Sequence, residues 1–173
     1  MRLSDGPGVK AELAIPVRPD AVWKLVSDIS TSPRFSPELQ RTEWLGGADG
    51  PAVGACFAGH NARPDGRRWQ TVCRITEFAP SHRFAWSVLP SVDTAPGDAF
   101  AHWHFELLPE PDDAGTRLVH GMRLGNLRTP IHAFVEAHPE QEEAVLGARL
   151  ANLRVGIEAV LGGIAADVTR PRA

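Results

Sequence analysis

His120 is the residue of this sequence whose surroundings suit chemistry best. It lies between Leu118 and Met122 in a stretch of alternating apolar residues, so all three side chains point to the apolar face of a predicted strand. An imidazole held there can orient a ligand oxygen or act as a general acid or base. The commoner explanation is a core histidine whose ring bonds to a backbone carbonyl, and this simpler interpretation stays open beside the catalytic one.

The other residue types that bind metals or carry covalent chemistry give weaker signals. His102 and His104 are two residues apart on the face opposite Trp103, and no third ligand accompanies them, so we expect a solvated outer face and no metal. Cys56 and Cys73 fit neither zinc nor redox spacings and project to opposite faces of the predicted sheet, which predicts free thiols. Glycine-rich nucleotide loops and Gly-x-Ser-x-Gly elbows are absent from the sequence. We therefore expect no cofactor.

The composition is that of one globular domain that spans residues 1–173. Of the 173 residues, 43% are apolar and 23% are charged, and the net charge is -3. This balance argues against a general binder of nucleic acids or anionic membranes. No apolar run approaches the length of a membrane span and the first residues do not form a signal peptide, so we expect a cytoplasmic protein with no membrane insertion. We expect a folded core over residues 9–166 and a disordered tail over residues 167–173.

Residues 139–166 predict a long helix, the element that the rest of the chain must accommodate. Pro139 suits a first helical position, and Glu140, Glu142 and Glu143 complement the positive end of the helix dipole. Apolar residues then recur at steps of three and four, at Leu146, Leu150, Leu153, Ile157, Val160, Leu161 and Ile164. This spacing places them on one helix face. At about 1.5 Å per residue the helix would be about 40 Å long, and a sheet must cover its apolar face.

The residues before that helix predict one strand, two helices, six strands and one short helix, in that order. Residues 9–15 alternate apolar and polar side chains as a half-buried strand does, and prolines then open a helix at 19–29 and a very short one at Ser32-Pro33. Six runs of period two follow, at residues 41–45, 55–61, 68–78, 83–89, 99–108 and 116–124, with turn residues between them that include 109–113. Short polar turns between consecutive strands predict an antiparallel meander. Thr129-Pro130 opens a short helix through Val135.

Several short motifs, in the right order along residues 9–165, resemble those of one known superfamily. They are Ala21-Val22-Trp23, Ser27-Asp28-Ile29, Ser36-Pro37-Glu38, Glu43-Trp44-Leu45-Gly46-Gly47, Gly54 with Phe57, Trp69 with Cys73, Ile75, Thr76 and Glu77, Phe84-Ala85-Trp86 and Gly115-Thr116-Arg117. With these motifs the sequence resembles the START-like (SRPBCC, Bet v 1-like) superfamily, and within it the polyketide cyclase/dehydrase group. The resemblance implies an α+β helix-grip fold, in which a curved seven-stranded antiparallel sheet wraps around the long C-terminal helix and two short helices follow the first strand. It also implies a cavity between sheet and helix.

Period-two spacing predicts which side chains would line such a cavity. From the sheet these are Phe57, Asn61, Trp69, Thr71, Cys73, Phe84, Trp86, Trp103, Phe105, His120 and Met122. Phe35, Leu39, Trp44 and Phe134 are expected at the mouth, and Leu146, Leu150, Leu153 and Ile157 on the helical wall. A few polar groups among aromatic walls are the usual make-up of a small-molecule site. The alternative is that the aromatic side chains fill a solid core.

Three functions are compatible with these expectations. Burial of apolar area favours binding of a small hydrophobic or aromatic molecule, such as a lipid or a polyketide. The resemblance implies, as an alternative, a polyketide aromatase/cyclase-dehydratase with His120 as acid or base. Such enzymes resemble this chain at Trp69 and Trp103, but they carry an arginine where this sequence has Ile75, and this sequence contains no tyrosine. A protein-interaction module is the third possibility, and a homodimer is compatible with all three.

Overall fold

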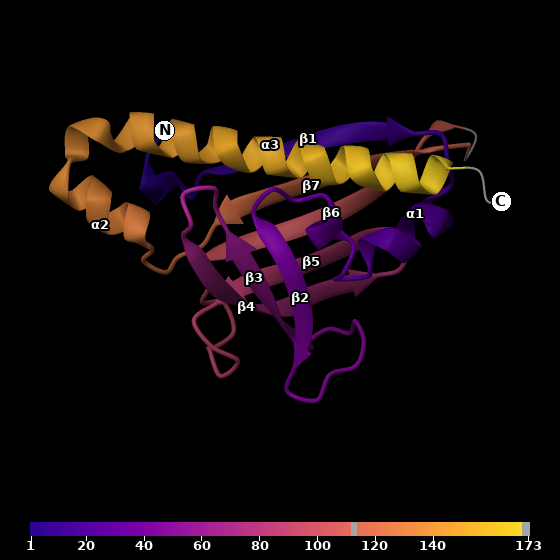
Figure 1. Cartoon of the computed structure of the whole chain (residues 1–173), viewed down its shortest axis with the longest axis horizontal. Helices are drawn as coiled ribbons and strands as arrows, with labels where there is room; N and C mark the ends of the chain where they lie inside the picture. Colours follow the sequence, from indigo (N-terminus) through magenta and orange to yellow (C-terminus); the bar gives the residue numbers. More distant parts are fainter. Residues whose placement is uncertain (112–113, 171–173) are drawn as a thin grey trace.

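The strands of the chain form one antiparallel sheet, and a long helix crosses one of its faces (Figure 1). The structure is a computed structural model that describes residues 1–111 and 114–170. The strands follow the order β1-β7-β6-β5-β4-β3-β2, so each strand from β2 to β7 pairs with its neighbour in sequence and β1 pairs with β7. The predicted helix-grip arrangement, a seven-stranded antiparallel sheet under a long C-terminal helix, is confirmed.

The elements begin and end close to the predicted residues. In chain order they are η1 (Leu3–Asp5), β1 (Gly8–Ile15), α1 (Pro19–Val26), η2 (Ser32–Arg34), β2 (Leu39–Leu45), β3 (Cys56–Ala62), β4 (Arg68–Ala79), β5 (Arg83–Leu89), β6 (Ala101–Pro109), β7 (Thr116–Leu124), α2 (Pro130–Ala137), η4 (Pro139–Gln141) and α3 (Glu142–Thr169). The bounds of β5 and β7 are as predicted, because Pro and Gly turn residues flank both strands. The short 3-10 turn η1 is an addition that the sequence did not indicate.

The first helix, α1, is shorter than predicted. It ends at Val26 instead of residue 29. The Ser27 hydroxyl donates to the carbonyl of Trp23 at 2.8 Å, and the Asp28 carboxylate accepts the amide of Ser30 at 2.8 Å. Such side-chain bonds to nearby backbone offer the chain an alternative to the helix, so the helix stops where they begin.

The long helix starts and ends later than predicted. Pro139–Gln141 form the separate turn η4, and α3 continues to Thr169. The expectation of a disordered tail is wrong for residues 167–169, because Asp167 pairs with Arg34 at 2.6 Å and Val168 packs against the core. Residues 171–173 of that tail lie outside the described residues, as do residues 112–113 of the predicted turn.

A β-bulge in β4 changes which side chains face the helix. Pairing with β5 skips Thr76 between Ile75 and Glu77, so the strand gains one residue without a partner. A bulge of this kind shifts the alternation of faces by one and increases the local twist. Phe78 therefore joins Ile75 on the core side, and it packs against the core there. A similar irregularity lies at Gln40 in β2.

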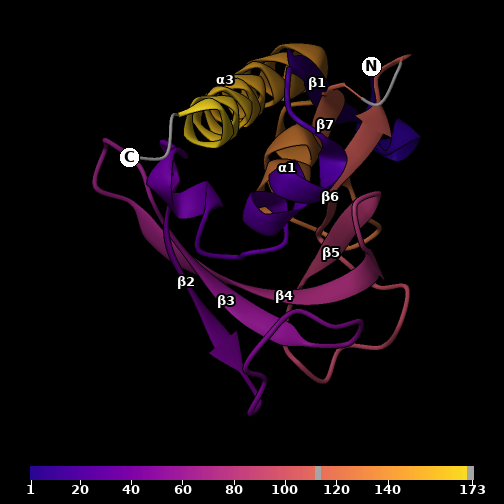
Figure 2. The ribbon, with the colours of Figure 1, turned by 90° about the vertical axis from the view of Figure 1, so that its right-hand side faces the viewer.

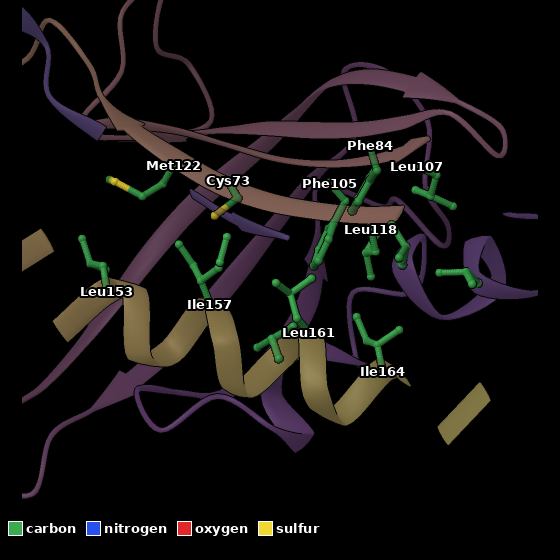
Figure 3. Close-up of a cluster of buried hydrophobic side chains, with 14 of the residues drawn as sticks. Cys73, Phe84, Phe105, Leu107, Leu118, Met122, Leu153, Ile157, Leu161 and Ile164 are labelled. Carbon is green, nitrogen blue, oxygen red and sulfur yellow. The ribbon is translucent and has the colours of Figure 1, made fainter. Parts of the chain in front are cut away.

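The core lies between the sheet and the inner face of α3. Figure 3 shows Leu153, Ile157, Leu161 and Ile164 pointing from α3 toward the sheet. Opposite them are Met122, Cys73, Phe84, Phe105, Leu118 and Leu107. Seen along α3, the strands β2, β3 and β4 curve away beneath the helix (Figure 2). Among the described helices, none has the length and apolarity that crossing a membrane requires.

Candidate ligand-binding face

The side of the sheet that faces α3, here called the concave face, gathers the predicted sheet residues. Opposed pairs on this face are Trp44–Phe57, Phe57–Cys73, Gly59–Thr71, Asn61–Trp69, Phe84–Phe105, Trp86–Trp103, Trp103–Met122 and Phe105–His120. Directly opposed side chains on one face lie within about 4.5–5.5 Å at their Cβ atoms. The predicted residues therefore form one continuous surface that runs from β2 to β7.

Solvent exposure divides this surface into two kinds of side chain. Phe84 and Phe105 are 2% and 1% exposed and belong to the packed core, as do Phe57, Cys73 and Met122. The predicted solid core is therefore present at these positions. Four tryptophans on the same face remain only half buried, although α3 lies over it, and they are Trp44, Trp69, Trp86 and Trp103. Leu39, Asn61 and Thr71 are half buried as well.

Aromatic contacts link three of the half-buried tryptophans into a chain across the sheet. Trp44 meets Phe57 edge to face, with ring centroids 6.1 Å apart, and Phe57 lies 6.3 Å from Trp86. Trp86 and Trp103 are stacked with an interplanar angle of 5° and a centroid distance of 6.2 Å. We call these four residues the aromatic row. Ring pairs in these geometries hold each other in place, so the row presents a rigid apolar surface.

His120 lies beside this row and is buried. Its Nδ1 lies 2.9 Å from the carbonyl oxygen of His104, and its ring stacks on Phe105 at 3.9 Å. A carbonyl can only accept a hydrogen bond, so Nδ1 carries the proton and Nε2 carries a lone pair. Burial lowers the pKa of His120 to about 4, which keeps the ring neutral near pH 7.

The second ring nitrogen of His120, Nε2, has no hydrogen-bond partner among the described residues, and His120 as a whole is 4% exposed. Each fully buried side-chain nitrogen or oxygen in residues 1–111 and 114–170 has a hydrogen-bond partner. The bond of the His120 ring there is made by Nδ1. Nε2 is therefore not fully enclosed, and it offers an acceptor on the concave face.

The other predicted polar residues bond to one backbone group. The Thr71 hydroxyl and the Asn61 amide nitrogen each lie 3.2 Å from the carbonyl oxygen of Gly59. A Cβ on Gly59 would come within 2.8 Å of the Thr71 hydroxyl and 3.1 Å of the Leu39 side chain, so a larger residue there would displace these side chains. Asn61 keeps its amide oxygen as an acceptor.

The expected mouth residues lie far apart. Phe35 lies against Gly163, where a Cβ would come within 2.1 Å of its ring. Phe134 belongs to α2, which adjoins the N-terminal end of α3 (Figure 1), and its ring is 40% exposed beside His138. The two ends of α3 are separated by about 1.5 Å per residue, or about 30 Å over twenty residues. The structure therefore does not bring Phe35 and Phe134 together at one opening.

A charged bridge that the sequence analysis missed ties α3 to the edge of the sheet. The Glu38 carboxylate accepts hydrogen bonds from Arg149 at 2.9 and 3.2 Å and from Arg63 at 2.8 Å. Arg63 also lies over the ring of Trp69 at 5.4 Å. Burial alone would raise the pKa of Glu38, but the hydrogen bonds from the two arginines outweigh it and hold the pKa below its usual value. Glu38 and Arg149 are 111 residues apart, so no local pattern could have revealed the pair.

Two surface hollows lie away from the concave face. One is on the outer side of β1, β7, β6 and β5, and the other lies beside α1 and the end of α3. His102 and His104 line the first, on the outer face as predicted, and among the described residues no group of His, Cys, Asp and Glu side chains is placed to hold a metal. Cys56 and Cys73 are both free.

The chain shares its fold with several solved structures. The Polyketide_cyc-like protein Cgl2372 from Corynebacterium glutamicum is 26% identical, with a TM-score of 0.60 over 93% of this chain and 90% of that one. The Zhui aromatase/cyclase from Streptomyces sp. R1128 is 18% identical, with a TM-score of 0.64 over 94% and 95%. Ara h 8.0201 is 15% identical, with a TM-score of 0.54 over 94% and 97%.

Sequence comparison gives the family. Among curated proteins, none shows significant similarity to this chain. The model of the family described as polyketide cyclase / dehydrase and lipid transport matches residues 7–158, which is most of the chain and includes every strand. The chain therefore belongs to the polyketide cyclase/dehydrase and lipid transport family.

Proposed function

We propose that this protein binds a small hydrophobic or aromatic molecule between the concave face and α3. The observation that carries the proposal is the half-buried state of Trp44, Trp86 and Trp103 on a face that the longest helix covers. A ligand that removes about 200 Å² of apolar surface from water gains about 5 kcal/mol before the costs of ordering. Membership in a family named for lipid transport supports the same class of ligand.

The polar groups of the concave face favour a ligand that carries a hydrogen-bond donor. Nε2 of His120 and the amide oxygen of Asn61 are both acceptors, and Thr71 adds a hydroxyl. A hydroxyl group at one end of an otherwise apolar ligand would satisfy such an acceptor. Few polar groups among aromatic walls give orientation, while the apolar area gives affinity.

The same observations make binding better supported than the cyclase/dehydratase alternative. A general acid at His120 would need a proton on Nε2, but the bond to His104 and the pKa of about 4 leave that atom unprotonated near pH 7, so only the role of a general base fits this ring. Ile75, which stands where the resembling enzymes carry arginine, is 1% exposed in the core. Arg74 beside it bonds to the carbonyl of Thr94 at 3.0 Å, in the loop between β5 and β6.

A fluorescent apolar probe tests the proposal directly. Wild-type protein titrated with N-phenyl-1-naphthylamine should give a saturable rise in probe emission. Trp103→Ala should weaken this binding at least tenfold, because it removes half of the stacked Trp86–Trp103 pair. Val155→Ala, at a side chain 61% exposed on the other side of α3, is the matched control and should bind as wild type does.

Two results would overturn the binding proposal. One is the absence of saturable probe binding to wild type, and the other is equal affinity in wild type and Trp103→Ala. If Trp103→Ala fails to unfold cooperatively in urea, Trp103→Leu replaces it, because leucine keeps the apolar volume while removing the ring. Native mass spectrometry of the purified protein gives an independent readout, in which a retained small molecule supports the proposal and identifies the ligand class.

A further inference from the structure

The outer face of the sheet, opposite α3, carries a second constellation of polar side chains. Strand register forms two adjacent rows there. The first row runs Gly8, Arg123, His102 and Ser87, and the second runs Lys10, Gly121, His104 and Ala85. In the second row Lys10 and His104 alternate with Gly121 and Ala85, and in the first row Arg123 and His102 are direct neighbours.

A hollow lies on this face, and its lining includes Gly8, Lys10, His102, His104 and Arg123. A Cβ on Gly121 would lie 2.8 Å from the Cβ of Lys10 and 3.0 Å from Cε1 of His104, so Lys10 and His104 close in over the glycine. A Cβ on Gly8 would lie 2.4 Å from the carbonyl oxygen of Met122. The hollow has a volume of about 590 Å³, within the usual range for sites of small molecules.

Of the basic side chains around the hollow, one has an acidic partner among the described residues and two do not. Arg83 is held by Glu77 at 2.8 Å and lies 3.9 Å from Glu106, so its charge is already compensated. In the described part of the chain, Lys10 and Arg123 form no ion pair. Two cations therefore border the hollow without a partner.

The two histidines add neutral hydrogen-bond donors. Nδ1 of His102 lies 2.9 Å from the hydroxyl of Ser87, which can donate to it and leave the N–H on Nε2. Burial first, and then Arg123, lower the pKa of His102. Burial is also the first cause for His104, where Arg83 and Lys10 lower the pKa further and Glu106 and Glu77 oppose them, so the net shift of that pKa is downward.

We propose that this hollow is a binding site for the oxyanion group, carboxylate or phosphate, of a small molecule. Lys10 and Arg123 would supply the charge, and His102 and His104 would donate N–H groups, a combination that suits oxyanions. The volume exceeds that of a single phosphate, so the anion would be one part of the ligand. The site lies on the other side of the sheet from the concave face and does not depend on the ligand proposed there.

Amide-detected NMR titration of the full chain tests this site with three probes at constant ionic strength, namely inorganic phosphate, pyrophosphate and citrate. We expect saturable shift changes at Gly121, Arg123, His102 and His104. Arg123→Gln and Lys10→Gln should each raise the dissociation constant at least fivefold. Arg117→Gln is the matched control, because Arg117 projects from the same face of β7 outside the hollow, and it should leave binding unchanged.

The outcomes separate the possible sources of the anion. Tighter binding of citrate assigns a carboxylate ligand, and tighter binding of pyrophosphate assigns a phosphorylated one. Three results would overturn the proposal. The shift changes could rise linearly with probe concentration, sodium chloride could reproduce them, or Arg117→Gln and Arg123→Gln could reduce them equally. A Gly121→Ala variant gives a second check, since a methyl group between Lys10 and His104 should abolish saturable binding in a protein that still unfolds cooperatively.

Discussion

The two halves of α3 face different surroundings, although one apolar stripe runs along both. In the C-terminal half, Leu161 and Ile164 are 2% and 0% exposed and lie opposite Leu118 and Leu107 (Figure 3). We call these four residues the sealed end. Side chains packed in this way contribute fully to stability, because neither water nor a ligand can reach them.

Two leucines in the N-terminal half of the same stripe are packed slightly less completely. Leu150 and Leu153 keep 9% and 8% of their surface exposed, whereas Leu146 before them is 1% exposed. We call these two leucines and the aromatic row of the sheet the open end. A surface that stays rigid through ring contacts but is not sealed can accept a ligand without unfolding. If the proposed ligand binds at the open end, the molecule separates stability from binding along the length of one helix.

The largest effect expected from this comparison concerns two leucines of the same helix. Leu161→Ala should lower the free energy of unfolding by about 3 kcal/mol, because it leaves a cavity among fully packed side chains. Leu153→Ala, at the open end, should lower it by about 1–2 kcal/mol, because part of that side chain is already accessible. Urea unfolding of both variants measures the difference. Equal losses would show that the two ends are packed alike.

Most of the fold could be predicted because it depends on local patterns. The seven apolar residues of α3 that the spacing of three and four assigns to one face are all buried, and turn residues mark the strands correctly. The errors arise where a side chain hydrogen-bonds to nearby backbone and ends a helix, as at Ser27. They also arise where a bulge shifts the alternation of the two sheet faces by one residue, as at Thr76. Asp167, which the sequence placed beyond the helix, is helical and pairs with Arg34, 133 residues away in the chain. No local pattern contains such a contact.

The candidate site could be predicted less completely, because burial depends on the whole sheet. Period two assigned Trp86 and Phe105 to the same face, but it could not tell that Trp86 is only partly buried while Phe105 is 1% exposed. That difference depends on how far β2, β3 and β4 curve from α3. The bridge of Glu38 to Arg149 likewise joins residues that only the folded chain brings together.

The next effect in size concerns His120, which lies beside the aromatic row. Its pKa is about 4 in the folded protein, against 6.5 for the free group, so the unfolded chain binds the proton first as the pH falls. The stability that the neutral ring provides is complete above pH 6.5 and is lost as the pH falls from there toward 4. At pH 5 the loss should be about 2 kcal/mol.

Comparison with His120→Gln isolates this contribution. The glutamine amide can still donate to the carbonyl of His104 but does not titrate. Urea unfolding at pH 7 and pH 5 should therefore show a smaller loss of stability in the variant, by about 2 kcal/mol. An identical pH dependence in both proteins would mean that His120 exchanges protons with solvent in the folded state at its ordinary pKa.

The smallest effect concerns the bridge of Glu38 with Arg149 and Arg63, which ties α3 to the edge of the sheet. Glu38→Gln should lower the free energy of unfolding by about 1 kcal/mol at pH 7, because it removes a half-buried carboxylate that two arginines share. The pKa of Glu38 is lowered from 4.5 in the folded protein, so this contribution is present above pH 4.5 and disappears as the pH falls below it.

Glu158→Gln is the matched control for the bridge, since it breaks an exposed pair with Arg154 on the same helix and should change stability by less than about 0.5 kcal/mol. Hydrogen exchange adds a local readout. If the bridge holds the edge of the sheet to the helix, Glu38→Gln should speed exchange in β2 and β3 more than in β6 and β7. If exchange becomes faster by the same factor in all four strands, the substitution lowers global stability only. Glu38 would then not hold the edge of the sheet to α3.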